Sequence, residues 1–143
     1  MDSRCRAEIT ELHQFFQDWF NGAVPDDHRT FARFAGVMGE GFVIVTPEGR
    51  AVERAALVDG LRGAHGRWRP EGKSGGRIWI ENVDVRHASD GMTAVTYEEW
   101  QEVDGRVRGR LSTALFGAKP GAPNGLEWLH VHETWLPDGR KKP

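Results

Sequence analysis

Two runs of strand-forming residues carry side chains suited to acid–base chemistry. Glu98 lies in the run over 92–103 and shares one face of it with Thr96 and Trp100, since side chains alternate along a strand. A carboxyl group buried beside an indole has a raised pKa, so Glu98 could act as a general acid or base near neutral pH. The other interpretation is an ordinary strand carboxylate that pairs with Arg110 or lies in water.

A pair of histidines offers a second candidate for proton transfer. His130 and His132 are two positions apart in the run over 126–136, so both imidazoles point to the same side. Either could shuttle a proton, because imidazole titrates near neutral pH. Two imidazoles are too few for a metal site, and the sequence does not fix a third ligand, for which Glu98 and Asp18 are the candidates, so we expect no metal. Hydrogen-bonded pocket histidines are the alternative.

Arg110 and Ser112 share one face of the run over 106–118. The paired N–H donors of Arg110 could bind a carboxylate or an enolate oxygen, and Ser112 could add a hydroxyl group. No nucleophile elbow surrounds Ser112, which argues against acyl transfer. Aromatic residues could wall an apolar ligand site, or could be plain core: Phe16, Trp19, Trp79, Trp100 and Trp128.

Helices are expected in the first half of the chain. Apolar residues recur every three or four positions from Ile9 to Ala23, and Asn21-Gly22 suits a helix end. Asp26-Asp27 can cap the start of a second helix, which we expect to end at Gly39 and Gly41. A short strand pair over 42–52 and a third helix over about 53–65 should follow.

Four long strands are expected in the second half, over 77–88, 92–103, 106–118 and 126–136. Asp-Gly turns are typical of hairpins, and runs joined by short turns pair antiparallel. Each run has a mainly apolar face and a mixed face of aromatic and polar residues. The mixed face could be solvated. Because a row of Trp, Phe and His is costly to expose, we expect it to line a cavity, with the apolar face toward a partner subunit.

Composition limits the class of protein. The 143 residues suffice for one domain over 1–143, with a core of about 7–136. A net charge of −2 gives no strong field for nucleic acid or an anionic membrane. One cysteine excludes an intrachain disulfide framework. No apolar run approaches the roughly 20 residues of a membrane span, and none follows Met1 as in a secretory signal, so we expect a cytoplasmic protein.

The order of elements and two segments resemble the nuclear transport factor 2-like superfamily, which includes SnoaL-like polyketide cyclases, ketosteroid isomerase and the association domain of calcium/calmodulin-dependent protein kinase II. Residues 41–54 are similar to the strand–turn–strand–helix entry of small bacterial members. Trp128 to Thr134 is similar to the final strand of the kinase domain, where a Trp precedes His-x-His-x-Ser, and Thr134 stands in place of that Ser.

The resemblance implies an α+β fold: a cone-shaped, curved antiparallel sheet with N-terminal helices over its concave face. It also implies a pocket between these layers and dimerisation through the sheet. Tyr97 is the only tyrosine and lies on the apolar face of its run, so the Tyr-and-acid oxyanion hole of the steroid isomerases is not expected. No clear match to the His/Asp arrangement of the polyketide cyclases is present.

We therefore expect a homodimer that binds a small organic molecule in a partly apolar pocket, without a cofactor. The expected pocket residues are Phe16, Trp19, Trp100, Ser112, Trp128 and His132. One alternative is a metal-free enzyme of the cyclase, isomerase or dehydratase type, in which Glu98 or His130 moves the proton and Arg110 stabilises negative charge. Another is a protein association module with a vestigial pocket. We expect the loop over 66–76 to be a lid over the pocket mouth, and no nucleic acid to bind.

Overall fold

The computed structural model describes residues 2–71 and 74–137. Positions 72–73 of the expected lid, and residues 138–143 of the tail, lie outside the described residues. The elements in chain order are α1 (Asp2–Phe20), α2 (His28–Ala35), β1 (Met38–Val45), β2 (Ala51–Glu53), α3 (Arg54–Arg62), β3 (Gly76–Ser89), β4 (Met92–Val103), β5 (Arg106–Ala118) and β6 (Leu126–Trp135).

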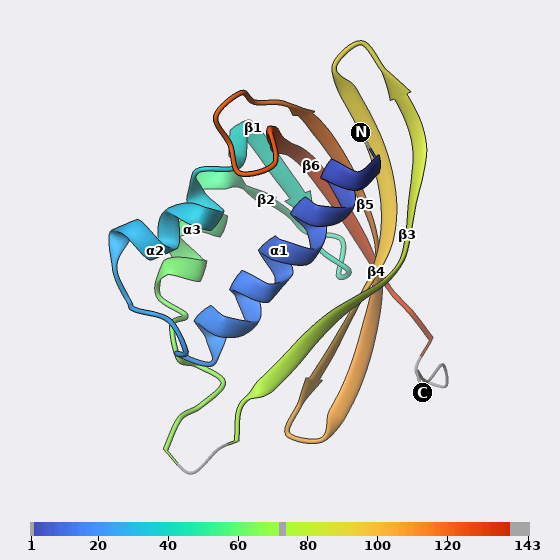
Figure 1. The fold of residues 1–143 in the computed structure, drawn as a ribbon. Coiled ribbons are helices and arrows are strands. Elements are labelled where there is room, and N and C mark those ends of the chain that lie inside the picture. Colours follow the sequence, from blue (N-terminus) through green and yellow to red (C-terminus); the bar gives the residue numbers. More distant parts are fainter. Residues whose placement is uncertain (1, 72–73, 138–143) are drawn as a thin grey trace.

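The strands form one curved sheet in the order β2-β1-β6-β5-β4-β3. Neighbouring strands are antiparallel except β1 and β6, which are parallel. Helix α1 crosses the concave face of this sheet, and α2 and α3 lie beside α1 toward β1 and β2 (Figure 1). The expected α+β class, with N-terminal helices over a curved sheet, is confirmed.

The core lies between α1 and the concave face of the sheet. Trp19 is fully buried there, and its Nε1 donates a hydrogen bond of 2.7 Å to the Leu61 carbonyl, which ties α1 to the end of α3. The Trp19 ring packs 5.0 Å from the ring of Phe31 in α2. Trp19 therefore joins the three helices and does not line the cavity described below, contrary to its expected place in the pocket.

The boundary between α2 and β1 differs from the expectation. Asp27 caps α2 as expected, since its Oδ1 accepts a hydrogen bond of 2.8 Å from the Thr30 N–H. However, α2 ends at Ala35, and β1 already begins at Met38. The Trp128 N–H donates to the Val37 carbonyl at 2.8 Å, so pairing with the distant strand β6 draws this segment into the sheet. Local sequence does not reveal such pairing.

A bulge in β6 changes which side chains face the helices. Trp128 pairs with Phe116 and His130 pairs with Leu115, so Leu129 is an extra residue between them. Two glycines make room for it: a Cβ on Gly39 or Gly117 would lie 3.3 Å or 3.2 Å from the Leu129 methyl groups. A bulge shifts the alternation of a strand by one residue.

As a result, Trp128 faces the concave side before the bulge, and Val131 and Glu133 face it after the bulge. Across the sheet, Tyr97, Ser112 and Glu133 stand in register on this side, and Glu99 stands beside Arg110. The expectation that the mixed face turns inward is right for β5, although Arg110 alone of that set lines the cavity. It is wrong for β4, where the set of Val95, Tyr97 and Glu99 faces inward, and wrong for β6 beyond Leu129.

Candidate functional site

A cavity of about 170 Å³ lies between the helices and the concave face of the sheet. Most of its wall is apolar and comes from α1, α2, α3, β1 and β6: Leu12, Phe16, Phe20, Phe34, Met38, Phe42, Ile44, Leu57, Leu61, Trp128 and Val131. Polar and ionisable side chains form the remainder: His13, Arg67, Tyr97, Glu99, Gln101, Arg110 and Glu133.

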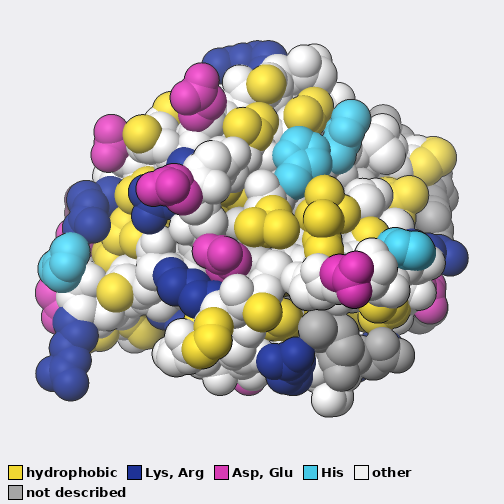
Figure 2. All heavy atoms as spheres, turned by 90° about the horizontal axis from the view of Figure 1, so that it is seen from above, with side chains coloured by type: hydrophobic (Ala, Val, Ile, Leu, Met, Phe, Trp, Pro, Cys, Tyr) yellow, Lys and Arg dark blue, Asp and Glu magenta, His cyan; other side chains and the backbone are white. Residues whose placement is uncertain are grey.

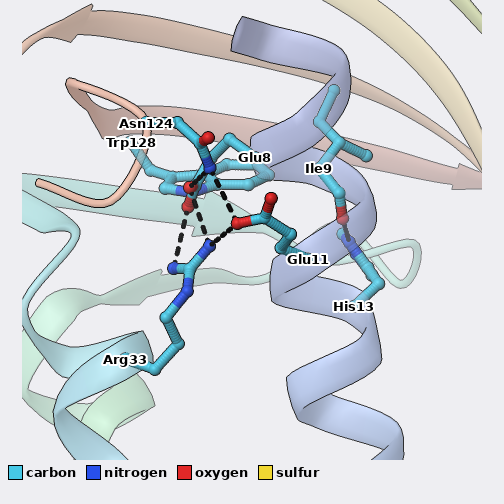
Figure 3. A network of polar contacts seen from close by, with 7 residues as sticks. All are labelled: Glu8, Ile9, Glu11, His13, Arg33, Asn124 and Trp128. Atoms are coloured by element: carbon cyan, nitrogen blue, oxygen red, sulfur yellow. Dashed lines mark hydrogen bonds and ion pairs between the residues drawn. The ribbon is translucent and has the colours of Figure 1, made fainter.

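His13 and Glu99 form a buried ion pair inside the cavity wall. His13 Nδ1 donates a hydrogen bond of 2.7 Å to the Ile9 carbonyl one turn earlier in α1 (Figure 3), and Nε2 lies 3.2 Å from Glu99 Oε1. Both neighbours of the imidazole are acceptors, so the doubly protonated ring satisfies both. Burial lowers the pKa of His13, but the charge of Glu99 and these hydrogen bonds outweigh burial, and the pKa is raised.

Glu99 is the ionised carboxylate of the site. Burial by itself raises its pKa, but the charges of His13 and Arg110 and hydrogen bonds from His13 and Gln101 lower it to about 2. The Gln101 amide donates to Glu99 Oε2 at 2.6 Å. Each carboxylate oxygen of Glu99 is therefore held by one neighbouring side chain, which fixes the group against the floor of the cavity.

Glu133 is the carboxyl group that retains a proton more readily. Arg110 Nη1 donates to Glu133 Oε1 at 3.0 Å. Burial raises the pKa of Glu133, Arg110 opposes that change, and the negative charge of Glu99 adds to it, so the pKa is raised overall. Burial and the two carboxylates also hold the pKa of Tyr97 well above its usual value. Two neighbouring carboxyl groups with pKa values moved in opposite directions are typical of acid–base sites.

Ser112 adds an unsatisfied hydroxyl group beneath this floor. It is 0% exposed and stands in register between Tyr97 and Glu133. Its proximity opposes the rise in the pKa of Tyr97, yet Oγ has no partner with full hydrogen-bond geometry among the described residues. A buried hydroxyl without a partner is uncommon in folded proteins, and Ser112 does not itself line the cavity, contrary to its expected place in the pocket.

A second polar cluster holds the Trp128 wall of the cavity. The carboxylate of Glu8 in α1 is fully buried and accepts hydrogen bonds from Arg33 at 2.8 and 3.2 Å, from Asn124 at 3.0 Å and from Trp128 Nε1 at 2.9 Å (Figure 3). Four donors thus satisfy one carboxylate. The cluster joins α1, α2, the β5–β6 loop and β6.

Several expected site residues lie on the outer face of the sheet. Glu98 is buried there, where it accepts hydrogen bonds of 3.0 Å from Trp100 Nε1 and from Asn82 Nδ2. The rings of His130 and His132 lie 6.5 Å apart, also outside the cavity. The placement of Glu98, Trp100, His130 and His132 in the cavity is therefore wrong, because of the inward face of β4 and the bulge at Leu129. Phe16, Trp128 and Arg110 do line the cavity.

The residues that sequence reasoning missed are His13, Glu99 and Glu133. A signal for His13 was present, because it lies four positions after Ile9 on the apolar stripe of α1. Glu99 likewise interrupts the otherwise apolar set of its strand. A titratable residue on a buried face is a candidate for a functional site.

Neither a metal site nor a membrane span is found within residues 2–71 and 74–137. No cluster of three or more His, Cys, Asp or Glu side chains there could hold a metal ion. No helix in the same part of the chain is long and apolar enough to cross a membrane.

The fold and its cavity define a protein of the nuclear transport factor 2-like class. A solved protein of this class and unknown function from Pseudomonas aeruginosa is 25% identical, with a TM-score of 0.80 over 94% of this chain and 99% of the other. Two further structures share the fold. Aln2 of Streptomyces has a TM-score of 0.64 at 20% identity, over 92% of this chain and 90% of its own. The CamKII hub homology domain of Chlamydomonas reinhardtii has a TM-score of 0.65 at 17% identity. The match covers 94% of this chain and 98% of that domain.

Within that class, the chain belongs to the sucrose-6-phosphate phosphohydrolase C-terminal family, whose sequence profile matches residues 5–137. A probable sucrose-phosphatase 2 of Arabidopsis thaliana is 28% identical over 128 residues, which are 90% of this chain and 29% of the relative. Sucrose-phosphatase 1 of Nicotiana tabacum is 25% identical over 130 residues, 90% of this chain and 30% of the relative. The chain thus spans less than a third of these relatives. The resemblance seen in the sequence identified the class but not this family.

Proposed function

We propose that the protein binds a small organic molecule in the cavity between α1 and the sheet. The observation that carries the proposal is the interacting cluster of His13, Glu99, Arg110 and Glu133 in the wall of a mostly apolar cavity. Buried charges are poor sources of stability, because desolvation offsets much of their attraction. Their concentration at a cavity is more typical of a binding or reaction site.

The ligand should be small and should carry both an apolar part and a polar group. Pockets for drug-sized molecules measure roughly 300–1,000 Å³, and this cavity measures about 170 Å³. Its aromatic and aliphatic walls suit an apolar body, while Tyr97 and Glu133 offer a donor and acceptors at the floor. Because the curated relatives are named sucrose-phosphatases, sucrose and its 6-phosphate belong among the compounds tested.

The first test fills the cavity from its edge. Leu57 of α3 lines the cavity and is half-buried, so Leu57→Trp places an indole in the cavity with little disturbance of the core. We expect native mass spectrometry to show a reproducible small molecule on the wild-type chain, carried through purification or taken from a panel of compounds. Leu57→Met, which nearly conserves volume, should retain that mass, and Leu57→Trp should lose it. Equal binding by Leu57→Trp, or bare chains throughout, would contradict the proposal.

Acid–base catalysis is the second candidate function. It is favoured by Glu133, which lines the cavity with a raised pKa and stands in register with Ser112 and Tyr97. In that case Glu133 moves the proton, and Arg110, 3.0 Å away, stabilises negative charge that develops on the bound molecule. Product that accumulates from the identified ligand with the wild-type chain but not with Glu133→Gln distinguishes an enzyme from a binding protein.

We further propose that the protein is a homodimer joined through the outer face of the sheet. Leu111 and Val107 lie on that face, with exposures of 39% and 44%. The solved hub domains that share this fold support association through such a domain. We expect light scattering to give a dimer for the wild-type chain and a monomer for Leu111→Glu, because a carboxylate at the interface would be desolvated. Arg29→Glu, at an exposed position of α2 on the helix side of the sheet, is the control, and a monomeric wild type would contradict the dimer.

A further inference from the structure

A basic groove adjoins the cavity near the β4–β5 hairpin. It has a volume of about 260 Å³ and shares Gln101 and Arg110 with the cavity. Three arginines at alternate positions of β5 line it, together with two tryptophans: Arg106, Arg108, Arg110, Trp68 and Trp135. Alternation along a strand places Arg106 and Arg108 on the same face as Arg110, so three guanidinium groups follow one another toward the mouth of the cavity.

The positive charge of this groove is only partly neutralised. Arg110 is paired with Glu133, but neither Arg106 nor Arg108 has an acidic partner among residues 2–71 and 74–137. Two acids that contact residues of the groove already accept hydrogen bonds. Glu48 accepts one from Trp135 Nε1, and Glu99 accepts from His13 and Gln101. An anion in the groove would therefore meet two arginines that no side chain in the described chain neutralises.

One of these arginines is held in place. The Arg108 guanidinium lies 3.7 Å from the centroid of the Trp135 ring, and Arg110 lies 4.9 Å from the same centroid. Trp135 is itself held by its hydrogen bond of 3.1 Å to Glu48. A guanidinium group that stacks on a ring uses its planar face and leaves the N–H groups at its edge free. These N–H groups can donate two hydrogen bonds to the oxygens of one carboxylate or phosphate.

We propose that this groove is a second binding site, for a small organic oxyanion, a phosphate monoester or a carboxylate, whose body packs against Trp68 and Trp135. The inference does not depend on occupation of the cavity. A volume of about 260 Å³ admits a small molecule, and the net charge of −2 provides no general attraction for a polyanion such as nucleic acid.

The test uses phenyl phosphate and benzoate as probes, with benzyl alcohol as the uncharged counterpart, in titration calorimetry on the full chain at low salt. We expect at least one anion to bind, benzyl alcohol not to bind, and affinity to fall with added salt. Arg108→Gln should weaken the anion about tenfold, because it removes a charge-assisted hydrogen-bond donor pair. Arg108→Lys keeps the charge but loses the paired N–H donors of the guanidinium group. Its affinity for the anion should lie between those of the wild type and Arg108→Gln.

The matched control is Arg77→Gln. Arg77 also stacks on a tryptophan, 4.4 Å from the Trp79 centroid, but it already pairs with Glu102 and lies outside the groove. Arg77→Gln should leave the affinity for the anion unchanged. Leu57→Trp, which changes the cavity and not the groove, should also leave it unchanged. An effect of Arg77→Gln equal to that of Arg108→Gln, or loss of anion binding in Leu57→Trp, would overturn the groove as a separate site. So would an RNA oligonucleotide that binds a hundredfold more tightly than either probe.

Discussion

Replacement of Glu8 by alanine is expected to lower the free energy of unfolding by about 3–5 kcal/mol, the usual cost when one member of a buried ion pair is removed. The substitution leaves Arg33 without its main partner and leaves the indole N–H of Trp128 without an acceptor in the core. For a chain of this length that free energy corresponds to a fall in melting temperature of roughly 10 °C, measurable by circular dichroism.

Glu11 provides the control for this experiment. It also contacts Arg33 and Asn124, at 3.5 and 3.0 Å, but its side chain is 53% exposed. Exposed ion pairs contribute about 0–1 kcal/mol, so Glu11→Ala should change the melting temperature little. Similar losses in the two variants would mean that the cluster acts through general surface charge and not through the buried carboxylate of Glu8.

A dependence of stability on pH is the second large expected effect, and it follows from the His13–Glu99 pair. The pKa of Glu99 falls from 4.5 to about 2 on folding, so its contribution is present above pH 4.5 and is lost as pH falls through about 2. The pKa of His13 rises from 6.5, so its contribution is complete below pH 6.5 and is lost as pH rises through the folded value.

Titration of Glu133, like that of His13, lowers the stability of the fold as pH rises. Its pKa is raised from 4.5, so any stability it contributes is present below pH 4.5 and is lost as pH rises through the folded value. The pair of His13 and Glu99 therefore contributes fully between pH 4.5 and 6.5. We expect urea unfolding to give the highest stability in that window and a decline in mildly alkaline buffer.

The double substitution His13→Gln with Glu99→Gln should make this decline shallower, because the neutral amides do not titrate, and should leave only the part that Glu133 causes. His87→Gln is the matched control, since His87 is an exposed histidine of β3 and should leave the pH profile unchanged. A decline as steep in the double variant as in the wild type would show that the His13–Glu99 pair does not cause it.

The elements of the fold could be predicted because their signals are local. The bounds of β4 and β5 match the sequence expectation at both ends, since Asp-Gly turns and glycines mark them. The end of α1 at Phe20 could be predicted for the same reason, because Asn21-Gly22 directly after it is a local signal for a helix end. The start of β1 at Met38 depends on pairing with a strand some ninety residues later, and no local pattern carries that pairing.

The cavity was predicted only in part, because side-chain direction depends on register. Arg110 was placed correctly, since β5 pairs with β4 without interruption. For β4 the regular alternation was read correctly, but the acid Glu99 was assigned to the outer face with its apolar neighbours. For β6 the extra residue Leu129 reverses the alternation after Trp128. Val131 and Glu133 therefore face inward, where His130 and His132 were expected.

The bulge at Leu129 also determines how this chain should be compared with other sequences. Phe116 pairs with Trp128 and Ala114 pairs with Val131, so removal of Leu129 would leave both pairs intact in a regular strand. A homologue with one residue fewer here would keep the same inward side chains. An alignment of the two chains therefore needs its gap at position 129. A gap placed elsewhere in β6 would equate His130 or His132 with inward positions and transfer functional residues to the wrong face of the sheet.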